Sequence, residues 1–137
     1  MITRETDYAV RVVLCLAAQA DLSSPVSTSA IAAEMGIPYR FLRRVVRRMT
    51  RERLIRTFRG KGGGIRLSRS PQRLSLYDVL RAIDPRGMKL NVCLLDQGTC
   101  TRKGTCAVHD AMEDLQSALE KNLRRVTFGR LTRPARG

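Results

Sequence analysis

The sequence predicts a mainly α-helical fold with a small β-hairpin wing, namely a winged helix-turn-helix followed by a long C-terminal dimerisation helix. Two short stretches with helical periodicity are separated by a tight turn at residues 36–38. A glycine-rich run at 60–64 lies between two short runs of β-branched, aromatic and leucine residues. A final stretch from residue 106 carries apolar residues at spacings of three and four.

The composition indicates one globular unit that binds a polyanion. The chain has 137 residues, of which 43% are hydrophobic, so it is long enough to bury a core. Lysine and arginine total 26 against 12 acidic residues, which gives a net charge of +14. Such an excess repels itself unless a polyanion is the partner, so DNA or RNA is the first expectation.

The chain is not expected to enter a membrane. No apolar run approaches the roughly 20 residues of a membrane span, and residues 1–7 lack a basic start followed by an apolar signal core. We therefore expect a cytoplasmic protein. Thiols are usually reduced in that compartment, so the four cysteines indicate metal ligands, reactive thiols or core residues before disulfides.

The first part of the chain predicts three helices. Residues 5–20 are apolar around most of the circumference and contain no glycine or proline, which is typical of a largely buried helix. Ser27 is a suitable N-cap for a short second helix that Gly36 ends. Pro38 suits the first position of a third helix. The apolar stripe of this third helix consists of Leu42, Val45, Val46 and Met49.

A second face of the third helix is cationic and consists of Arg40, Arg43, Arg44, Arg47 and Arg51. No acidic residue lies among them, so in an ordinary solvated helix they would repel one another. The second helix of a helix-turn-helix enters the major groove of DNA. We expect most of these arginines to bind phosphates and one or two near the helix start to reach guanine edges.

The stretch LIRTFRGKGGGIRLSR, residues 54–69, predicts a hairpin with a flexible tip, the wing. Arg59 and Lys61 lie beside bare glycine backbone and suit a phosphate or the minor groove, although the glycines could serve the turn alone. Tyr39 could belong to the core or contact the DNA backbone. The residues expected to bind DNA are Tyr39, Arg40, Arg43, Arg44, Arg47, Arg59 and Lys61.

The second half of the chain predicts two more helices. Ser75 can cap a helix that Pro85 ends, residues 86–105 look irregular, and a last helix is expected from Cys106 to about Phe128. Its stripe consists of Val108, Met112, Leu115, Leu119, Leu123 and Val126. Such a stripe at the end of a small domain is available for a second copy of the chain.

The expected organisation has four parts. Residues 1–85 form a winged helix-turn-helix DNA-binding domain, and residues 86–105 form a cysteine-bearing loop. Residues 106–128 form a dimerisation helix, and residues 129–137 form a flexible basic tail.

Three of the four cysteines and the only histidine lie between residues 93 and 109. Thiolates suit iron–sulfur clusters, zinc or copper(I), and three cysteines with a histidine also make a tetrahedral zinc site. Spacing alone leaves iron–sulfur, zinc and plain thiols open. His109 lies three positions after Cys106, so on a helix the two point to the same side, but it could also pair with an acidic neighbour. Cys15, in an apolar helix, is expected in the core.

Several motifs carry a family resemblance. The opening TDYAVRVVLCLA, the wing RGKGGGIRLSR, the helix SLYDVLRAID and the cysteine triplet before a long helix resemble the IscR/NsrR/RirA family of bacterial winged-helix regulators. The resemblance covers almost the whole chain. It implies a homodimeric repressor that binds a double-stranded DNA operator. It also implies an iron–sulfur cluster, [2Fe-2S] or [4Fe-4S], that senses redox, nitric oxide or iron status.

The resemblance also implies the ligands. Carried over by position, the cysteine ligands are Cys93, Cys100 and Cys106. The fourth ligand is His109 by likeness to the cluster-biogenesis regulator, or Asp7 of the partner subunit by likeness to the nitric-oxide sensors. Asp7 also has a plain alternative, because Arg4 and Arg11 are placed to form ion pairs with it.

Two other functions remain open. One is a winged-helix regulator with structural zinc or thiol-only sensing. The other is an iron–sulfur electron carrier or small redox enzyme, which explains the thiols but not the arginine-rich helix. No Ser/His/Asp set, phosphate loop or carboxylate pair supports catalysis, so we expect no enzyme.

Overall fold

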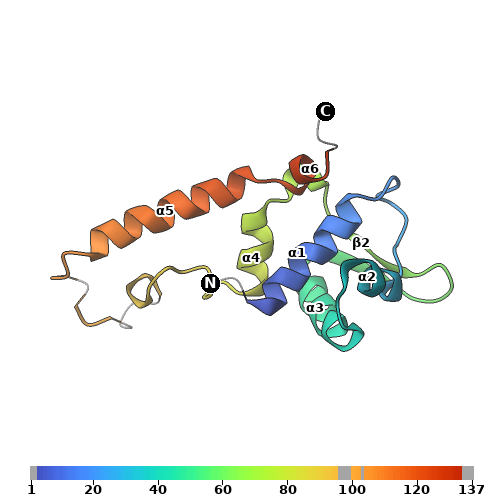
Figure 1. Ribbon diagram of the computed structural model, residues 1–137, viewed down its shortest axis with the longest axis horizontal. Helices are drawn as coiled ribbons and strands as arrows, with labels where there is room; N and C mark the ends of the chain where they lie inside the picture. The colour runs from blue at the N-terminus through green and yellow to red at the C-terminus, as the bar shows by residue number, and fades with distance from the viewer. Residues whose placement is uncertain (1–2, 96–99, 103, 134–137) are drawn as a thin grey trace.

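A winged helix-turn-helix forms one end of the molecule, and a long helix extends away from it (Figure 1). The computed structural model describes residues 3–95, 100–102 and 104–133. The elements are α1 (Arg4–Ala17), α2 (Thr28–Met35), α3 (Tyr39–Arg51), β1 (Ile55–Phe58), β2 (Gly64–Leu67), the 3-10 turn η1 (Pro71–Arg73), α4 (Leu76–Ile83), the 3-10 turn η2 (Val92–Leu94), α5 (His109–Arg125) and α6 (Phe128–Leu131). The mainly helical fold with a two-stranded hairpin is the one expected. Among the described helices, none is both long and apolar enough to cross a bilayer.

The ends of the helices follow the capping residues. The Ser27 side chain accepts a hydrogen bond from a backbone N–H in the first turn of α2, and Gly36 ends α2 in the left-handed conformation, at φ 64°. Ser75 and Asp78 form a reciprocal capping box at the start of α4. Pro38 is the N-cap of α3 and not its first helical residue, because its ψ of 127° is still extended. Helix α1 ends at Ala17, three residues earlier than expected.

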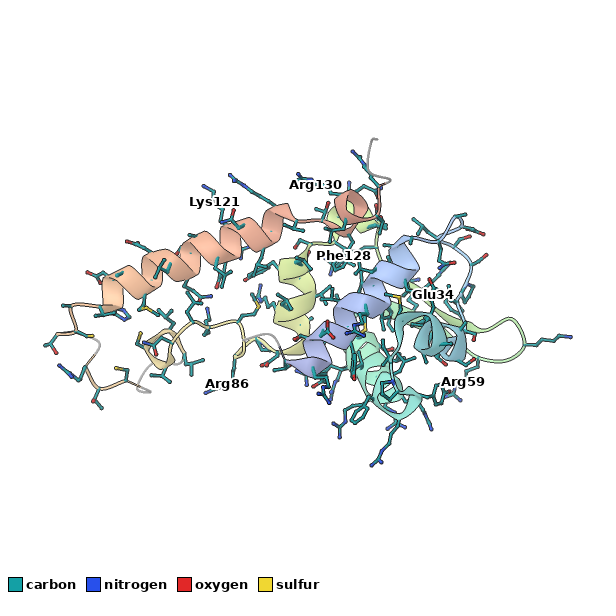
Figure 2. All side chains as sticks on the ribbon, in the orientation of Figure 1. Glu34, Arg59, Arg86, Lys121, Phe128 and Arg130 are labelled. Carbon is teal, nitrogen blue, oxygen red and sulfur yellow. The ribbon has the colours of Figure 1, made fainter. Side chains whose placement is uncertain are left out.

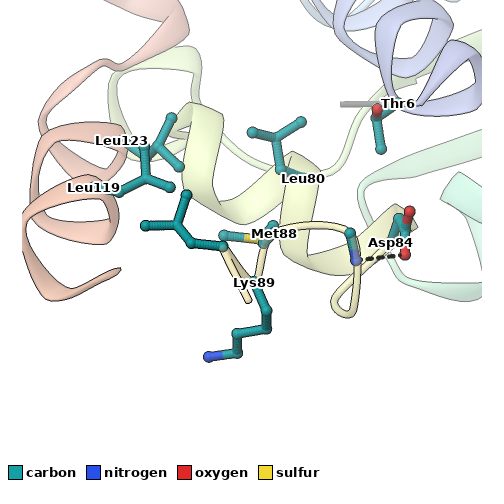
Figure 3. A pocket seen from close by; sticks show the side chains of 9 residues that line it. Thr6, Leu80, Asp84, Met88, Lys89, Leu119 and Leu123 are labelled. Atoms are coloured by element: carbon teal, nitrogen blue, oxygen red, sulfur yellow. Dashed lines mark hydrogen bonds between the residues drawn. The ribbon is translucent and has the colours of Figure 1, made fainter. Parts of the chain in front are cut away.

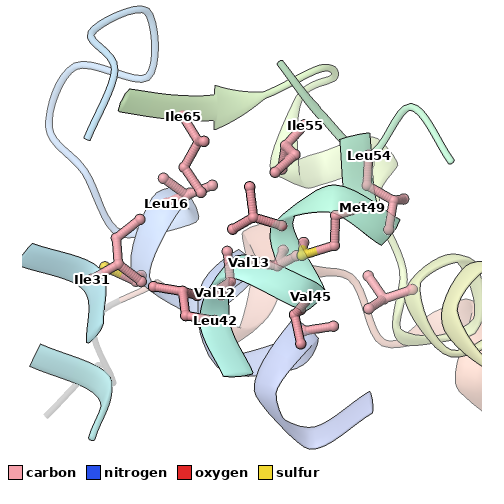
Figure 4. Close-up of a cluster of buried hydrophobic side chains, with 14 of the residues drawn as sticks. Val12, Val13, Leu16, Ile31, Leu42, Val45, Met49, Leu54, Ile55 and Ile65 are labelled. Atoms are coloured by element: carbon pink, nitrogen blue, oxygen red, sulfur yellow. The ribbon is translucent and has the colours of Figure 1, made fainter. Parts of the chain in front are cut away.

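The core is built around α1 (Figure 4). Its Val12 and Val13 are fully buried, and α2, α3 and α4 pack against it. The predicted inner stripe of α3 is buried in full, so the arginine face of the same helix must point outward. Cys15 lies in this core, as expected, and burial raises the pKa of its thiol to about 11.

The wing is an antiparallel hairpin in which Ile55 pairs with Leu67 and Phe58 pairs with Gly64. Val26, from the chain before α2, adds a bridge to Ile65 through two backbone hydrogen bonds of 2.8 and 2.9 Å. Gly64 has φ 148°, and a Cβ there would lie 2.2 Å from the Val26 carbonyl oxygen. Only glycine permits this close approach, which ties the wing to the helical unit.

The last long helix differs from the expectation at both ends. It starts at His109, so Cys106 precedes it, and it stops at Arg125, because Val126 turns to an extended conformation. The carbonyl oxygen of Val126 then accepts a hydrogen bond from Leu76 N at 2.9 Å. The stripe predicted for this helix therefore ends before Val126.

The chain after α5 is folded onto the winged unit. Phe128 N donates a hydrogen bond of 2.9 Å to Leu74 O, Thr127 caps α6, and the Phe128 side chain is fully buried within the main core. The predicted basic tail begins at residue 129, whereas the structure places residues 129–131 in α6, which packs against η1 and α1. Burial of a large aromatic side chain stabilises this segment against fraying. Residues 134–137 of the predicted tail lie outside the described residues.

Candidate functional site

The outward face of α3 presents a set of exposed cations. They are Arg40, Arg43, Arg44, Arg47 and Arg51. Within the residues that the structure describes, none of these five arginines is paired with a carboxylate. Guanidinium groups without such partners suit phosphate oxygens, which they can bind in a bidentate manner.

A shallow hollow of about 880 Å³ lies over this arginine face. Tyr39 lines it and is 51% exposed, so Tyr39 is not a core residue. Arg48 lines the hollow too, but it forms an ion pair of 3.6 Å with Glu52. Glu5, from the first turn of α1, also lines the hollow. Sequence alone offers no reason to select Glu5, because an acid in the first turn of a helix is explained by the helix dipole.

The tip of the wing, between β1 and β2, carries two exposed cations, Lys61 and Arg59, the second of which is labelled in Figure 2. Arg66 on the same hairpin is engaged, because its guanidinium lies 4.9 Å from the centre of the Phe58 ring and donates a hydrogen bond of 3.0 Å to Ser23 O. The cations at the tip of the wing are therefore placed for a ligand, whereas Arg66 supports the hairpin.

The cysteine-bearing segment lies between α4 and α5 in the chain, and its turn η2 packs against α5 (Figure 1). Cys93 lies in η2, and Cys93, Cys100 and Cys106 are half-buried free thiols. Among the described residues, the one group of three potential ligand side chains within 4.8 Å is His109, Asp110 and Glu113. Within that part of the chain, the three cysteines and His109 thus do not form one compact group.

His109 is the most constrained of the predicted ligands. The residue is 7% exposed, and its Nε2 lies 3.1 Å from the Glu113 carboxylate. Its Nδ1 is buried and has no hydrogen-bond partner in the described part of the chain. An unpaired buried nitrogen is costly, and a metal ion would satisfy it. Three soft thiols close to this nitrogen in sequence fit an iron–sulfur cluster or zinc.

Asp7 forms an ion pair with Arg11 of its own helix, which is one of the two partners that the sequence allowed. Its carboxylate lies 2.9 Å from Arg11 Nη2, and both side chains are more than a third exposed. An ion pair this exposed is weak, so Asp7 could exchange Arg11 for another partner at little cost.

An apolar hollow of about 640 Å³ lies between α4, α5 and the start of the cysteine-bearing segment (Figure 3). Its apolar lining consists of Leu80, Met88, Leu90, Leu119 and Leu123. Leu90 in this lining is exposed, and so is Leu115, which lies on α5 outside the hollow. An apolar surface of this kind is typical of an interaction site.

Comparison with known proteins shows the family of the chain. Residues 2–134 match the Rrf2 family, described as "Iron-dependent Transcriptional regulator". The chain is 34% identical over 125 residues to the "Putative HTH-type transcriptional regulator Rv1287" of Mycobacterium tuberculosis, and the match covers 90% of this chain and 76% of that protein. It is 28% identical over 117 residues to the HTH-type transcriptional repressor NsrR of Streptomyces coelicolor, covering 85% and 78%.

The fold is also similar to that of CymR, the global cysteine regulator of B. subtilis. The TM-score is 0.75 at 17% identity, and the match covers 96% of this chain and 95% of that one. At this identity the likeness concerns the fold alone.

Proposed function

The chain belongs to the Rrf2 family of transcriptional regulators, and from that premise we propose that it is a homodimeric repressor whose affinity for a DNA operator is controlled by an iron–sulfur cluster. Family membership confirms the resemblance drawn from the motifs and the expectation of a regulator, not an enzyme. The operator, the dimer and the cluster belong to the proposal.

The outward face of α3 is the observation that carries the proposal. Its five arginines are exposed and lack carboxylate partners among the described residues. Most of them bind phosphates, which position the protein, and those near the start of α3 read base edges in the major groove. Arg59 and Lys61 on the wing contact the neighbouring backbone or minor groove.

The cluster would be held by Cys93, Cys100 and Cys106, with His109 as the fourth ligand. Support comes from the buried, unpaired Nδ1 of His109 and from the Glu113 carboxylate that holds its other ring nitrogen. Asp7 of the partner subunit is the alternative, since its present ion pair is weak. In a cluster with one non-thiolate ligand, the iron at that ligand would be labile. Oxygen or nitric oxide could react there, and iron could be lost from it.

A second copy of the chain would cover the apolar surface of α5. The hollow beside Leu119 and Leu123 and the exposed Leu115 support this arrangement. A two-fold dimer places two α3 helices on half-sites about one helical turn of DNA apart. Any change in the tilt of α5 then alters the fit to both half-sites.

The first experiment tests whether the arginines of α3 bind DNA phosphates, by removing one positive charge at a time. Arg47→Ala should lower the slope of log affinity against log salt by about one unit, as expected for one lost phosphate contact. Lys121→Ala removes the same charge from α5 and is the matched control (Figure 2). Equal effects of the two substitutions, or no binding of duplex DNA at low salt, would refute the assignment of α3 as the DNA-binding helix.

The second experiment tests the cluster. Protein purified without oxygen should be brown and contain iron and sulfide, and loss of the cluster should change its affinity for a duplex selected by the wild-type protein from a random pool. Alanine at Cys93, Cys100 and Cys106 should abolish both effects, whereas Cys15→Ala should keep them, because Cys15 lies in the core. Equal affinity of the loaded and cluster-free wild-type protein would contradict control by a cluster.

Thiol-only or zinc-based regulation is the second candidate. It is favoured by one observation: within the described residues, the three cysteines are free thiols that do not form one compact ligand group with His109. Colourless protein that contains zinc, or no metal, and whose DNA affinity responds to a thiol oxidant would support this candidate over the cluster.

A further inference from the structure

We propose that Gln116 is a positioning residue: its buried amide attaches the start of the cysteine-bearing segment to α5, so that a change at the cysteines is transmitted to that helix. This inference rests on the proposed function, because it concerns the link between the ligands and the dimer helix.

The Gln116 amide uses its oxygen and both of its N–H groups. The residue is 6% exposed. Its Oε1 accepts from Leu90 N at 2.9 Å, and its Nε2 donates to Met88 O at 3.2 Å and to a Glu120 oxygen at 3.0 Å. One side chain on α5 therefore holds the backbone on both sides of Lys89.

Lys89 and Glu120 complete the arrangement. Lys89 Nζ lies 3.3 Å from the same Glu120 oxygen. The hydrogen bond from Gln116, together with Lys89, lowers the pKa of Glu120, so this carboxylate is charged at neutral pH. We call Gln116, Glu120, Lys89 and the backbone of residues 88–90 the latch.

The latch lies close to the predicted ligands in the chain. Asn91 follows it directly and caps η2, where Cys93 lies, through a hydrogen bond of 2.9 Å from Val92 N. At the far end of the segment, the His109 backbone N–H donates to Cys106 O at 3.2 Å. The segment is thus attached to α5 at two places, one near Cys93 and one at Cys106. In this proposal, a movement of Cys93 or Cys106 is transmitted to α5 through the attachment beside it.

A buried amide at position 116 is informative because it lies beside an apolar part of the α5 surface. Leu119 and Leu123 on the same helix line the apolar hollow. A buried amide is unfavourable unless it is fully bonded, whereas a fully bonded one fixes a single arrangement of the groups around it. This site therefore specifies where residues 88–90 lie, which an apolar side chain would not do.

The test compares Gln116→Met with Asn122→Leu. Methionine keeps the length of the side chain and removes the amide. Asn122 is an exposed amide on α5 that donates a hydrogen bond of 3.0 Å to Ala118 O of its own helix, and it is the matched control. In cluster-free protein, Gln116→Met should speed hydrogen exchange of residues 88–92 by about tenfold, as expected for the loss of two hydrogen bonds to backbone groups. Asn122→Leu should leave this rate unchanged.

The second measurement is the ratio of DNA affinities of the loaded and cluster-free protein, for a duplex selected by the wild-type protein. Gln116→Met should move this ratio toward one while the cluster-free affinity stays the same. A wild-type ratio of one overturns the proposed function and this inference together. A wild-type ratio that differs from one and is unchanged in Gln116→Met overturns only the inference.

A second variant covers the case in which Gln116→Met does not fold. Lys89→Met removes only the ion pair with Glu120 and should change the exchange rate and the affinity ratio in the same direction by a smaller amount. Wild-type values for both measurements in Lys89→Met, with Gln116→Met unfolded, would count against the latch.

Discussion

Replacing Phe128 with alanine tests whether the chain after α5 belongs to the core. The Phe128 side chain is fully buried in the main cluster of the winged unit. Truncation of a buried phenylalanine costs about 3–5 kcal/mol, as lost transfer free energy plus the cavity left behind. A typical domain is stable by about 5–15 kcal/mol. We therefore expect Phe128→Ala to lose a large share of the free energy of unfolding.

Urea unfolding followed by circular dichroism measures this loss, at one fixed protein concentration because dimer formation shifts the midpoint. The matched control is Leu131→Ala on the same short helix, where the side chain is 47% exposed and the cost should stay within about 0.5 kcal/mol. A loss below about 1 kcal/mol for Phe128→Ala, with an unchanged m-value, would refute the core position of Phe128 and support a flexible tail.

Other substitutions and reagents test the thiols, the latch and the wing. In folded, metal-free protein, Cys15 should resist iodoacetamide at about pH 8, because burial raises the pKa of its thiol to about 11. Cys93, Cys100 and Cys106 should react with the reagent. Peptide mass spectrometry measures the labelling of each cysteine. Hydrogen bonds in the latch lower the pKa of Glu120 below its ordinary value of 4.5, so its contribution to stability is present above that pH and is lost as the pH falls through the folded value. Glu120→Gln should therefore make the free energy of unfolding, measured in urea, fall less steeply on acidification than in wild type. Gly64→Ala should lower the thermal midpoint, because its Cβ would lie 2.2 Å from a backbone oxygen.

Each of these three predictions has a control or a contrary outcome. Equal labelling of Cys15 and the other cysteines would contradict its core position. Asp114→Asn removes an exposed carboxylate from α5 and is the control for Glu120→Gln. If the pH dependence of the free energy of unfolding changes as much in Asp114→Asn as in Glu120→Gln, the result would count against the latch. A Cβ at Gly104 would meet no atom within 4 Å, so Gly104→Ala should leave the thermal midpoint unchanged; an equal drop in both glycine variants would argue against a specific contact at Gly64.

The sequence predicted the winged helix-turn-helix well because its signals are local. The two faces of α3 follow from the helical period, and Ser27, Gly36 and Ser75 act at helix ends as their chemistry predicts. The ion pair between Asp7 and Arg11 also follows from a spacing of four on a helix.

The features that the sequence did not predict depend on contacts between distant segments. The apolar stripe of α5 continues in sequence through Val126, so periodicity alone could not show that the chain turns there to pair with residues 74–76. Gln116 lies between stripe positions and suggests a solvated side chain until residues 88–90 are placed against it. The grouping of the cysteines stays a prediction, because spacing in sequence does not set distances across a loop.

The attachment of the chain just after α5 to the winged unit has a mechanical consequence. The 17 residues of α5 span about 25 Å at about 1.5 Å per residue, and its C-terminal end leads directly into the buried Phe128. The helix therefore acts as a stiff lever. Its fixed end is at Arg125, beside the winged unit, and its free end is at His109. A displacement of about 2 Å at His109, a size common in helix shifts, turns such a lever by about 5°. A small chemical change near His109 would thus rotate α5 relative to the winged unit.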